Sequence, residues 1–278
     1  MIALAAFGDE IATDLDEQLS TMAAVGVHRL DLRAAWGTPV LRLDDAQVER
    51  VRAGLQAHDA RIASVASPIG KQPIDAPFHE QVDMLERAII LARTFGARYI
   101  RIFSYYPPAS AEGPVDPATY RDEVLRRLRE LTARARAANL VLIHENEKDI
   151  YGDTILRCVD LLAGIDDPHF RAVFDPANFI QCAQTPYPDG YTALAPWLAY
   201  VHVKDALQDG SVVPAGEGAA RWPELLTRLR IDGYDGILSL EPHLAAAGRY
   251  AGFSGPRLFE RAAQALQTML HQIEWEYR

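Results

Sequence analysis

The side chains best suited to chemistry in this sequence are three carboxylates and one imidazole in its second half. Each stands at the end of a short run of β-branched and aromatic residues; they are Glu145, Asp175, His202 and Glu241. Three carboxylates can lie close together as anions only when a cation compensates their charge. Oxygen ligands with one imidazole nitrogen suit Mn²⁺, Mg²⁺ or Co²⁺, and Zn²⁺ is also possible. If the fold brings the four together, we predict a site for one divalent metal ion, with Mn²⁺ as the first candidate.

The rest of the sequence predicts elements that could position these residues. Short β-rich runs alternate with longer helical patterns, which is typical of βαβ units around a parallel sheet. Eight strands are expected, at 2–8, 28–33, 61–67, 98–104, 139–146, 170–175, 199–204 and 236–241. Eight strands, each followed by a helix-sized segment, match a closed (β/α)8 TIM barrel, which commonly takes about 250 residues. We therefore predict the α/β class and one such barrel domain over residues 1–278.

Several expected helices are followed by a residue that ends a helix easily. Gly26, Gly96 and Gly164 stand where the helical patterns stop, as glycine often does at a helix C-terminus. The arginine-rich stretch from Arg121 has apolar residues at helical spacing, so its charges are expected on a solvated helix face. A doubly wound open sheet is the alternative fold, but it usually leaves a Gly-rich fingerprint after the first strand. The sequence FGDEIATD at that point has none.

In a barrel of this kind, catalytic groups stand at the carboxyl ends of the strands. The four candidate ligands end the fifth, sixth, seventh and eighth expected strands in turn. Because side chains alternate along a strand, an inward direction for the four implies the same direction for residues two or four positions earlier. Those residues are Val141, Val173, Tyr200 and Ser239.

Charge and composition exclude several other classes of protein. The net charge is −10 and the pI is near 5.3, which argues against nucleic acid as a partner. No apolar run approaches the roughly 20 residues that cross a bilayer, so no membrane partner is expected. The first residues meet acid by Asp9 and lack the basic flank of a signal peptide. Cys158 and Cys182 form no CxxC pair, which favours reduced thiols and a cytoplasmic protein.

Particular stretches of the sequence resemble a known family. The chain resembles the sugar-phosphate isomerase/epimerase family in seven stretches. They are FGDEIATDLDEQL, SPIGK, LIHENEKDIYGDT, VFDPANF, YVHVKDA, GEG at 216–218 and LSLEPH. These are xylose-isomerase-like TIM barrels that include D-tagatose epimerases and inosose dehydratases. Their metal set maps here onto Glu145, Asp175, His202 and Glu241. Many members carry a His three residues after the strand-six Asp, whereas this chain has Asn178.

The resemblance implies a metal-dependent isomerase or epimerase of a small keto-sugar or sugar-like polyol. Glu145 and Glu241 are then the acid/base pair, which moves a proton next to a metal-polarised carbonyl. A leaving group β to the carbanion would instead give a dehydratase or lyase, and the sequence leaves both outcomes open. A multi-metal endonuclease would need histidines where strands two to four end in Arg33, Ser67 and Ser104. A non-catalytic sugar-binding barrel is a further alternative, against which the four intact ligands argue.

Other polar and aromatic residues are expected around the substrate. The candidates are Lys204, Arg33, Trp36, Lys71, Tyr105, Asn178, His243 and Glu217. Lys204 should face the cavity, either on a substrate oxygen or in an ion pair with a site acid. Trp36 could stack on a sugar or cap the barrel, and His243 could bind a hydroxyl or brace its loop. Trp275 and Tyr277 could pack at the interface of a homo-oligomer or cap the barrel.

Overall fold

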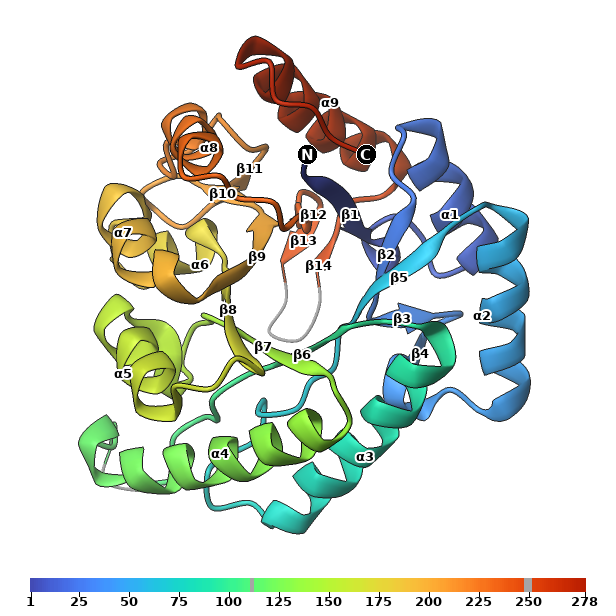
Figure 1. Cartoon of the computed structure of the whole chain (residues 1–278). Helices are drawn as coiled ribbons and strands as arrows, with labels where there is room; N and C mark the ends of the chain where they lie inside the picture. Colours follow the sequence, from blue (N-terminus) through green and yellow to red (C-terminus); the bar gives the residue numbers. More distant parts are fainter. Residues whose placement is uncertain (111–112, 248–251) are drawn as a thin grey trace.

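The fold is known from a computed structural model that describes residues 1–110, 113–247 and 252–278. Eight parallel strands close into a barrel in the order β1-β12-β9-β8-β7-β6-β5-β2, with the helices in a ring around it (Figure 1). The barrel strands are β1 (Ala3–Phe7), β2 (Arg29–Leu32), β5 (Arg61–Val65), β6 (Tyr99–Ile102), β7 (Val141–Glu145), β8 (Phe170–Phe174), β9 (Leu198–Val203) and β12 (Ile237–Leu240). Each overlaps the range predicted for it. The predicted (β/α)8 barrel is confirmed, and an open sheet is excluded.

Helices cover the outside of the barrel and short elements extend its mouth. The helices are α1 (Leu15–Ala24), α2 (Asp45–Ala57), α3 (Phe78–Phe95), α4 (Arg121–Ala137), α5 (Ile155–Ile165), α6 (Pro176–Gln181), α7 (Tyr191–Leu194), α8 (Trp222–Ile231) and α9 (Pro256–Gln272). Short helical turns are η1 (Gly8–Glu10), η2 (Val40–Arg42), η3 (Pro117–Thr119), η4 (Tyr151–Asp153), η5 (Pro186–Gly190) and η6 (Ala195–Trp197). Three two-stranded hairpins follow barrel strands: β3 (Ala34–Ala35) with β4 (Thr38–Pro39), β10 (Asp205–Ala206) with β11 (Val212–Val213), and β13 (Ala246–Ala247) with β14 (Gly252–Phe253).

The helix ends follow local rules, with one correction. Gly96 ends α3 in the left-handed conformation at φ 68°, as predicted. The predicted end at Gly164 is wrong, because α5 continues to Ile165 and stops at Asp166, whose φ is 44°. Gly164 has a packing role instead: a Cβ there would lie 3.2 Å from the Leu125 side chain of α4.

The barrel interior is filled, and its filling supports the residues above it. Val141, Val173 and Tyr200 belong to a buried cluster inside the barrel, as the alternation predicted. Ser239 also points inward, since its hydroxyl donates to Asp31, as does the Ser64 hydroxyl. The Tyr200 hydroxyl lies 2.8 Å from both Asp31 carboxylate oxygens. A fully satisfied polar group in the interior limits the ways in which these strands can pack.

Three expectations about the rest of the chain can be compared with the structure. Trp275 is 8% exposed and packs in the main core, so it is not the exposed aromatic that an interface would need. Tyr277 lies against the ring of His271. Cys158 and Cys182 are both free thiols. None of the described helices has the length and apolar character needed to cross a membrane.

Candidate metal centre

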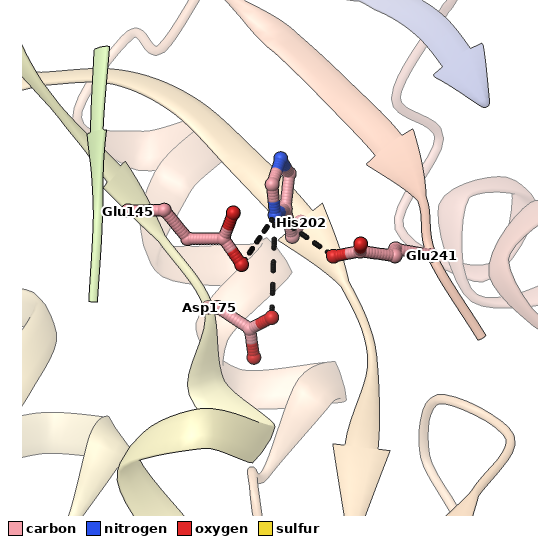
Figure 2. A group of neighbouring side chains, drawn as sticks. All are labelled: Glu145, Asp175, His202 and Glu241. Atoms are coloured by element: carbon pink, nitrogen blue, oxygen red, sulfur yellow. Dashed lines mark ion pairs between the residues drawn. The ribbon is translucent and has the colours of Figure 1, made fainter. Parts of the chain in front are cut away.

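Four neighbouring strand ends bring the predicted ligands together at the mouth of the barrel (Figure 2). One ligand atom from each of Glu145, Asp175, His202 and Glu241 lies within 4.8 Å of every other, and all four residues are buried. His202 Nδ1 stands at the centre of the group, 3.3 Å from Glu145 Oε1 and 3.1 Å from Glu241 Oε2. Asp175 Oδ2 lies 4.0 Å from the same nitrogen.

The donor atoms of this cluster fit a divalent ion. Asp175 Oδ2, His202 Nδ1 and Glu241 Oε2 are buried and lie close to one another. Their nearest neighbours are charged groups, with Lys204 Nζ 2.8 Å from Asp175 Oδ2 and His202 Nδ1 3.1 Å from Glu241 Oε2. A divalent ion bound here would take the place of some of these pairings. Three oxygens and one nitrogen, with no thiolate, match hard or borderline ions such as Mg²⁺, Mn²⁺ or Co²⁺. In the part of the chain that the structure describes, no other group of three or more His, Cys, Asp or Glu side chains could hold an ion.

The charges of the cluster depend strongly on one another. Burial lowers the pKa of His202, but the facing Glu145 and Glu241 carboxylates outweigh burial and raise that pKa to about 10. Burial also raises the pKa of Glu145. The positive charges of His202 and, to a smaller extent, Arg101 outweigh burial and lower that pKa to about 2. The pKa of Glu241 is likewise held well below its ordinary value, against burial, by Lys204 and His202. Both glutamates are therefore ionised at neutral pH.

Arg101 is a buried arginine of β6 that the sequence analysis missed. Its Nη1 donates to Glu145 Oε2 at 3.0 Å and lies 3.5 Å from Glu241 Oε1. The guanidinium lies over the rings of Phe7 and Phe103, each 5.0 Å away. One signal was present in the sequence: Arg101 is two residues from Phe103 in an otherwise apolar strand, so it interrupts a buried face. Arg101 thus joins the two glutamates through the oxygens that do not face His202.

We expect Arg101→Met to lower the free energy of unfolding by about 3–5 kcal/mol, because it leaves buried carboxylates without their partner. Since Arg101 helps to hold the Glu145 pKa down, that pKa should also rise, and for the activity proposed below the acidic limb of the kcat/KM profile should move to higher pH. Arg101→Lys should restore part of both effects. Thermal unfolding and pH–rate profiles measure them.

Arg127→Met is the matched control, because Arg127 is also buried but pairs with Glu123, on α4. That change should reduce stability without moving the pH profile. An unmoved acidic limb in Arg101→Met would contradict the effect of Arg101 on the Glu145 pKa.

Arg33 has the same kind of role on the other side of Glu241. Its Nη1 lies 2.9 Å from Glu241 Oε1, and its Nη2 lies 3.1 Å from Glu10 Oε1. Its Nε donates to Asp9 Oδ2 at 2.7 Å. The Arg33 guanidinium thus forms ion pairs with three carboxylates. Arg33 thus contacts Glu241 directly, and its contact with a substrate stays a prediction.

Two asparagines brace the carboxylates from behind. Asn146 exchanges hydrogen bonds with the main chain of Asp175, donating to its carbonyl at 2.8 Å and accepting from its N–H at 2.9 Å. Asn178 Nδ2 donates to Glu145 Oε1 at 3.3 Å and to the Asn146 carbonyl at 2.9 Å. The Asn178 N–H also donates to Asp175 Oδ1, which caps α6. Asn178, expected near the substrate, thus contacts the ligand residues themselves.

His243 connects the site to the loop after β12. Its Nε2 lies 3.1 Å from Glu10 Oε1 and 3.4 Å from Glu241 Oε1. Gly252 of β14 packs directly against the His243 ring. A Cβ on residue 252 would lie 1.8 Å from a carbon of that ring, so no larger residue fits there without a shift. Ser254 Oγ donates to Glu10 Oε2 at 3.1 Å. These contacts fit a role for His243 in bracing its loop, and its contact with a substrate hydroxyl stays a prediction.

Two buried lysines lie in segments that follow different barrel strands. Lys204 Nζ lies 2.8 Å from Asp175 Oδ2 and 4.0 Å from Glu241 Oε2, and its side chain is 3% exposed. This ion pair with a site acid is one of the two readings expected for it. Lys71 Nζ lies 3.0 Å from Glu147 Oε2 and 4.3 Å from the centre of the Phe103 ring.

Three other residues predicted to contact the substrate pair with residues outside the candidate metal centre. Trp36 lies under the guanidinium of Arg50 on α2, 4.0 Å from it. Tyr105 is fully buried in the main core, and its ring faces Arg127 of α4 at 5.4 Å. Glu217 is exposed and pairs with Arg261 on α9 at 2.7 Å. These residues lie in loops beyond the strands, where the two-residue alternation no longer sets direction.

The endonuclease alternative finds no support in the remaining strand ends. Ser67 Oγ donates to the Arg101 carbonyl at 2.6 Å, and Ser104 Oγ accepts from the Gly152 N–H at 2.7 Å. Both hydroxyls thus form hydrogen bonds with main-chain groups. Arg33 is occupied by carboxylates, as described above.

Comparison with known proteins agrees with this architecture. Among solved structures, the chain is similar to the probable 3-DHS dehydratase AsbF of Bacillus anthracis, with a TM-score of 0.74, 20% identity, and coverage of 96% of this chain and 99% of that one. It is also similar to a xylose isomerase-like TIM barrel protein of Mycobacterium smegmatis in complex with magnesium, with a TM-score of 0.74, 20% identity and coverage of 98% and 97%. D-psicose 3-epimerase of Clostridium cellulolyticum H10 is a third, with a TM-score of 0.72, 14% identity and coverage of 98% and 99%.

These likenesses at low identity establish the fold. Among curated proteins, none matches the chain significantly. A family model described as xylose isomerase-like TIM barrel matches residues 22–269. That range holds all four residues of the candidate metal centre, and the chain belongs to the xylose isomerase-like TIM barrel family.

Proposed function

We propose that this protein is a divalent-metal-dependent isomerase or epimerase of a small keto-sugar or sugar-like polyol. Glu145 and Glu241 are the acid/base pair, and together with Asp175 and His202 they hold the metal. The observation that carries the proposal is the placement of the two glutamates: Figure 2 shows them reaching His202 from opposite sides. Membership of a family named for an isomerase supports it, as does the likeness in fold to an epimerase.

The placement of the glutamates suits proton transfer at a carbon atom. A divalent ion held by the four residues would act as a Lewis acid on a carbonyl oxygen. Glu145 and Glu241 come from β7 and β12, so a substrate lying between them presents one face to each. One carboxylate takes the proton from the carbon beside the carbonyl. The same carboxylate, now protonated, can return that proton to the neighbouring carbon, which gives an isomer. Protonation of the opposite face, which gives an epimer, uses the other carboxylate after it has taken up a proton from solvent. The lowered pKa of Glu145 and of Glu241 keeps the carboxylate that takes the proton in its ionised form beforehand.

Solvent deuterium tests this proposal directly. The Mn²⁺-supplemented protein is incubated with a panel of keto-sugars in D₂O, and substrate and product are analysed by NMR and mass spectrometry. Deuterium at a carbon beside the carbonyl, with a change of configuration or carbonyl position, supports isomerase or epimerase chemistry. Loss of water from the substrate, with the same first exchange, would show the dehydratase alternative. Absence of exchange with every metal and sugar would contradict the proposal.

Lys204→Met separates the two readings of this lysine. We expect kcat/KM to fall by an amount that corresponds to about 1.5–3 kcal/mol, typical of losing one charged hydrogen bond to substrate, with metal content unchanged. Steady-state kinetics and metal analysis measure the two quantities. Lys148→Met is the control, since Lys148 bonds Gln181 at 2.7 Å outside the cluster. A lower melting temperature beside an unchanged kcat/KM would show that Lys204 is only an ion-pair partner of Asp175.

A further inference from the structure

A cavity lies at the end of the barrel opposite to the candidate metal centre. Its volume is about 680 Å³, within the range of small-molecule sites. Arg29 and Arg61 begin β2 and β5, and Arg98 directly precedes β6, so all three mark the amino ends of the strands. The candidate ligands stand at the carboxyl ends. The two sites are therefore separated by the length of the barrel.

The lining of this cavity contains more arginines than acidic residues. Arg29 and Arg61 are direct neighbours in the register of β2 and β5. Within residues 1–110, 113–247 and 252–278, no acidic side chain forms an ion pair with Arg29, Arg61 or Arg98. Glu49 also lines the cavity but pairs with Arg52, at 3.0 Å. The chain has a net charge of −10, yet these three arginines have no acidic side chain as a partner among the described residues. An anionic ligand would neutralise their charge.

The arginines of this cavity also affect one another electrostatically. The pKa of Arg29 is lowered by burial first and then by the charges of Arg278 and Arg61. Arg29 Nη1 donates to the main-chain oxygen of Arg278 at 3.2 Å, which leaves the rest of its guanidinium for other partners. Repulsion between neighbouring cations is relieved when an anion binds between them.

The floor of the cavity differs from its rim. Ala63, Tyr99 and Ile237, which pack against or belong to the cluster inside the barrel, line the cavity below the arginines. The guanidinium of Arg98 lies 5.6 Å from the centre of the Tyr99 ring. The cavity thus combines an apolar and aromatic floor with a cationic rim, which suits a small molecule that has both a ring and an anionic group.

We propose that this cavity binds a phosphorylated small molecule, with its phosphate held by Arg29, Arg61 and Arg98. The planar guanidinium donates two parallel hydrogen bonds that match phosphate oxygens, and an exposed lysine does not offer that geometry. The body of the molecule lies toward Tyr99 and Ile237. The site is separate from the proposed catalytic centre and does not depend on its function.

Inorganic phosphate and AMP are the probes. Binding is measured by calorimetry on the full chain at constant ionic strength, with the dependence of the melting temperature on ligand as a second readout. We expect Arg61→Gln combined with Arg98→Gln to raise the Kd of each probe at least about tenfold, since each arginine supplies a charged hydrogen bond. Arg61→Lys with Arg98→Lys keeps the charge without the fork and should give an intermediate Kd. AMP should bind more tightly than phosphate, because its ring reaches the floor.

Two controls locate the binding. Arg42→Gln with Arg257→Gln removes the same charge from exposed arginines outside the cavity and should leave both Kd values unchanged. Lys204→Met alters the mouth and should also leave them unchanged. The proposal is overturned if neither probe binds, if the Arg61 and Arg98 change has no more effect than the Arg42 and Arg257 change, or if Lys204→Met abolishes binding. Melting temperatures without ligand show that each variant is folded.

Discussion

Glu145→Gln and Glu241→Gln should each lower kcat by about 10²–10⁴-fold, the size typical of losing a general acid or base. Glutamine keeps the shape of the side chain but can neither accept the substrate proton nor supply the anionic charge that the cluster uses. Glu241 carries the larger set of contacts, with Arg33 at 2.9 Å and His202 at 3.1 Å. Its loss should therefore disturb the site at least as much as that of Glu145. Rates are measured with the sugar identified by deuterium exchange.

Metal content must be measured beside each rate, because each glutamate is both a candidate ligand and a candidate acid/base group. A variant that keeps its metal and loses turnover locates the proton transfer on that side chain. A variant that loses both assigns the residue to the metal centre. Glu224→Gln is the matched control, since Glu224 is an exposed acid paired with Arg221 on the surface. Full activity in either cluster variant would refute the acid/base assignment.

Removal of metal should abolish activity completely, and its return should restore it. The full chain is treated with a chelator and dialysed, and Mn²⁺, Co²⁺, Mg²⁺ or Zn²⁺ is then added at increasing concentration. We expect about one ion per chain, since one compact group of ligands is present. The melting temperature should rise with metal, because an ion that binds only the folded state stabilises that state. Activity that survives exhaustive chelation would contradict metal dependence.

Metal binding should also release a proton, and the direction follows from the pKa of His202. Without metal, the neighbouring carboxylates raise that pKa from 6.5 to about 10. The ring is therefore protonated at neutral pH, whereas an imidazole ligand must be neutral. Below pH about 10, metal affinity should fall about tenfold for each unit that the pH falls, because one proton competes with the ion. Calorimetry in buffers of different ionisation enthalpy measures this release directly.

His202→Gln should remove the proton release while the carboxylates remain. A wild-type chain that binds metal with no net proton release would show that His202 is neutral before binding, or that it is not a ligand. Either result would contradict the role assigned to His202 here.

The four candidate ligands could be recognised in the sequence because two simple rules act together. A parallel barrel places all strand carboxyl ends at one mouth, and the two-residue period sets which side chains face inward. Glu145 and Glu241 are far apart in the sequence, yet both follow a short apolar run at the same relative position. The same reasoning explains why the inward direction of Val141 and Tyr200 was predicted correctly.

Only the tertiary structure decided what surrounds these ligands. Arg101 contacts Glu145 and Glu241 because the closed barrel brings β6, β7 and β12 around one centre. Sequence patterns could not reveal this contact, because Arg101 and the two glutamates belong to different strands that meet only in the folded barrel.

The loops show the limit of sequence reasoning most clearly. Trp36 and Tyr105 have φ values of 54° and 69°, so the chain turns sharply at each, and neither extends the direction of its strand. Glu10 and His243, from opposite ends of the chain, meet at 3.1 Å only because β1 pairs with β12 to close the barrel. The sequence by itself thus determined the strands, their inward faces and the four side chains that meet at the mouth, since these follow from local periodicity. Barrel closure and loop geometry decided the partners of those ligands, because contacts between distant segments arise only when the chain packs.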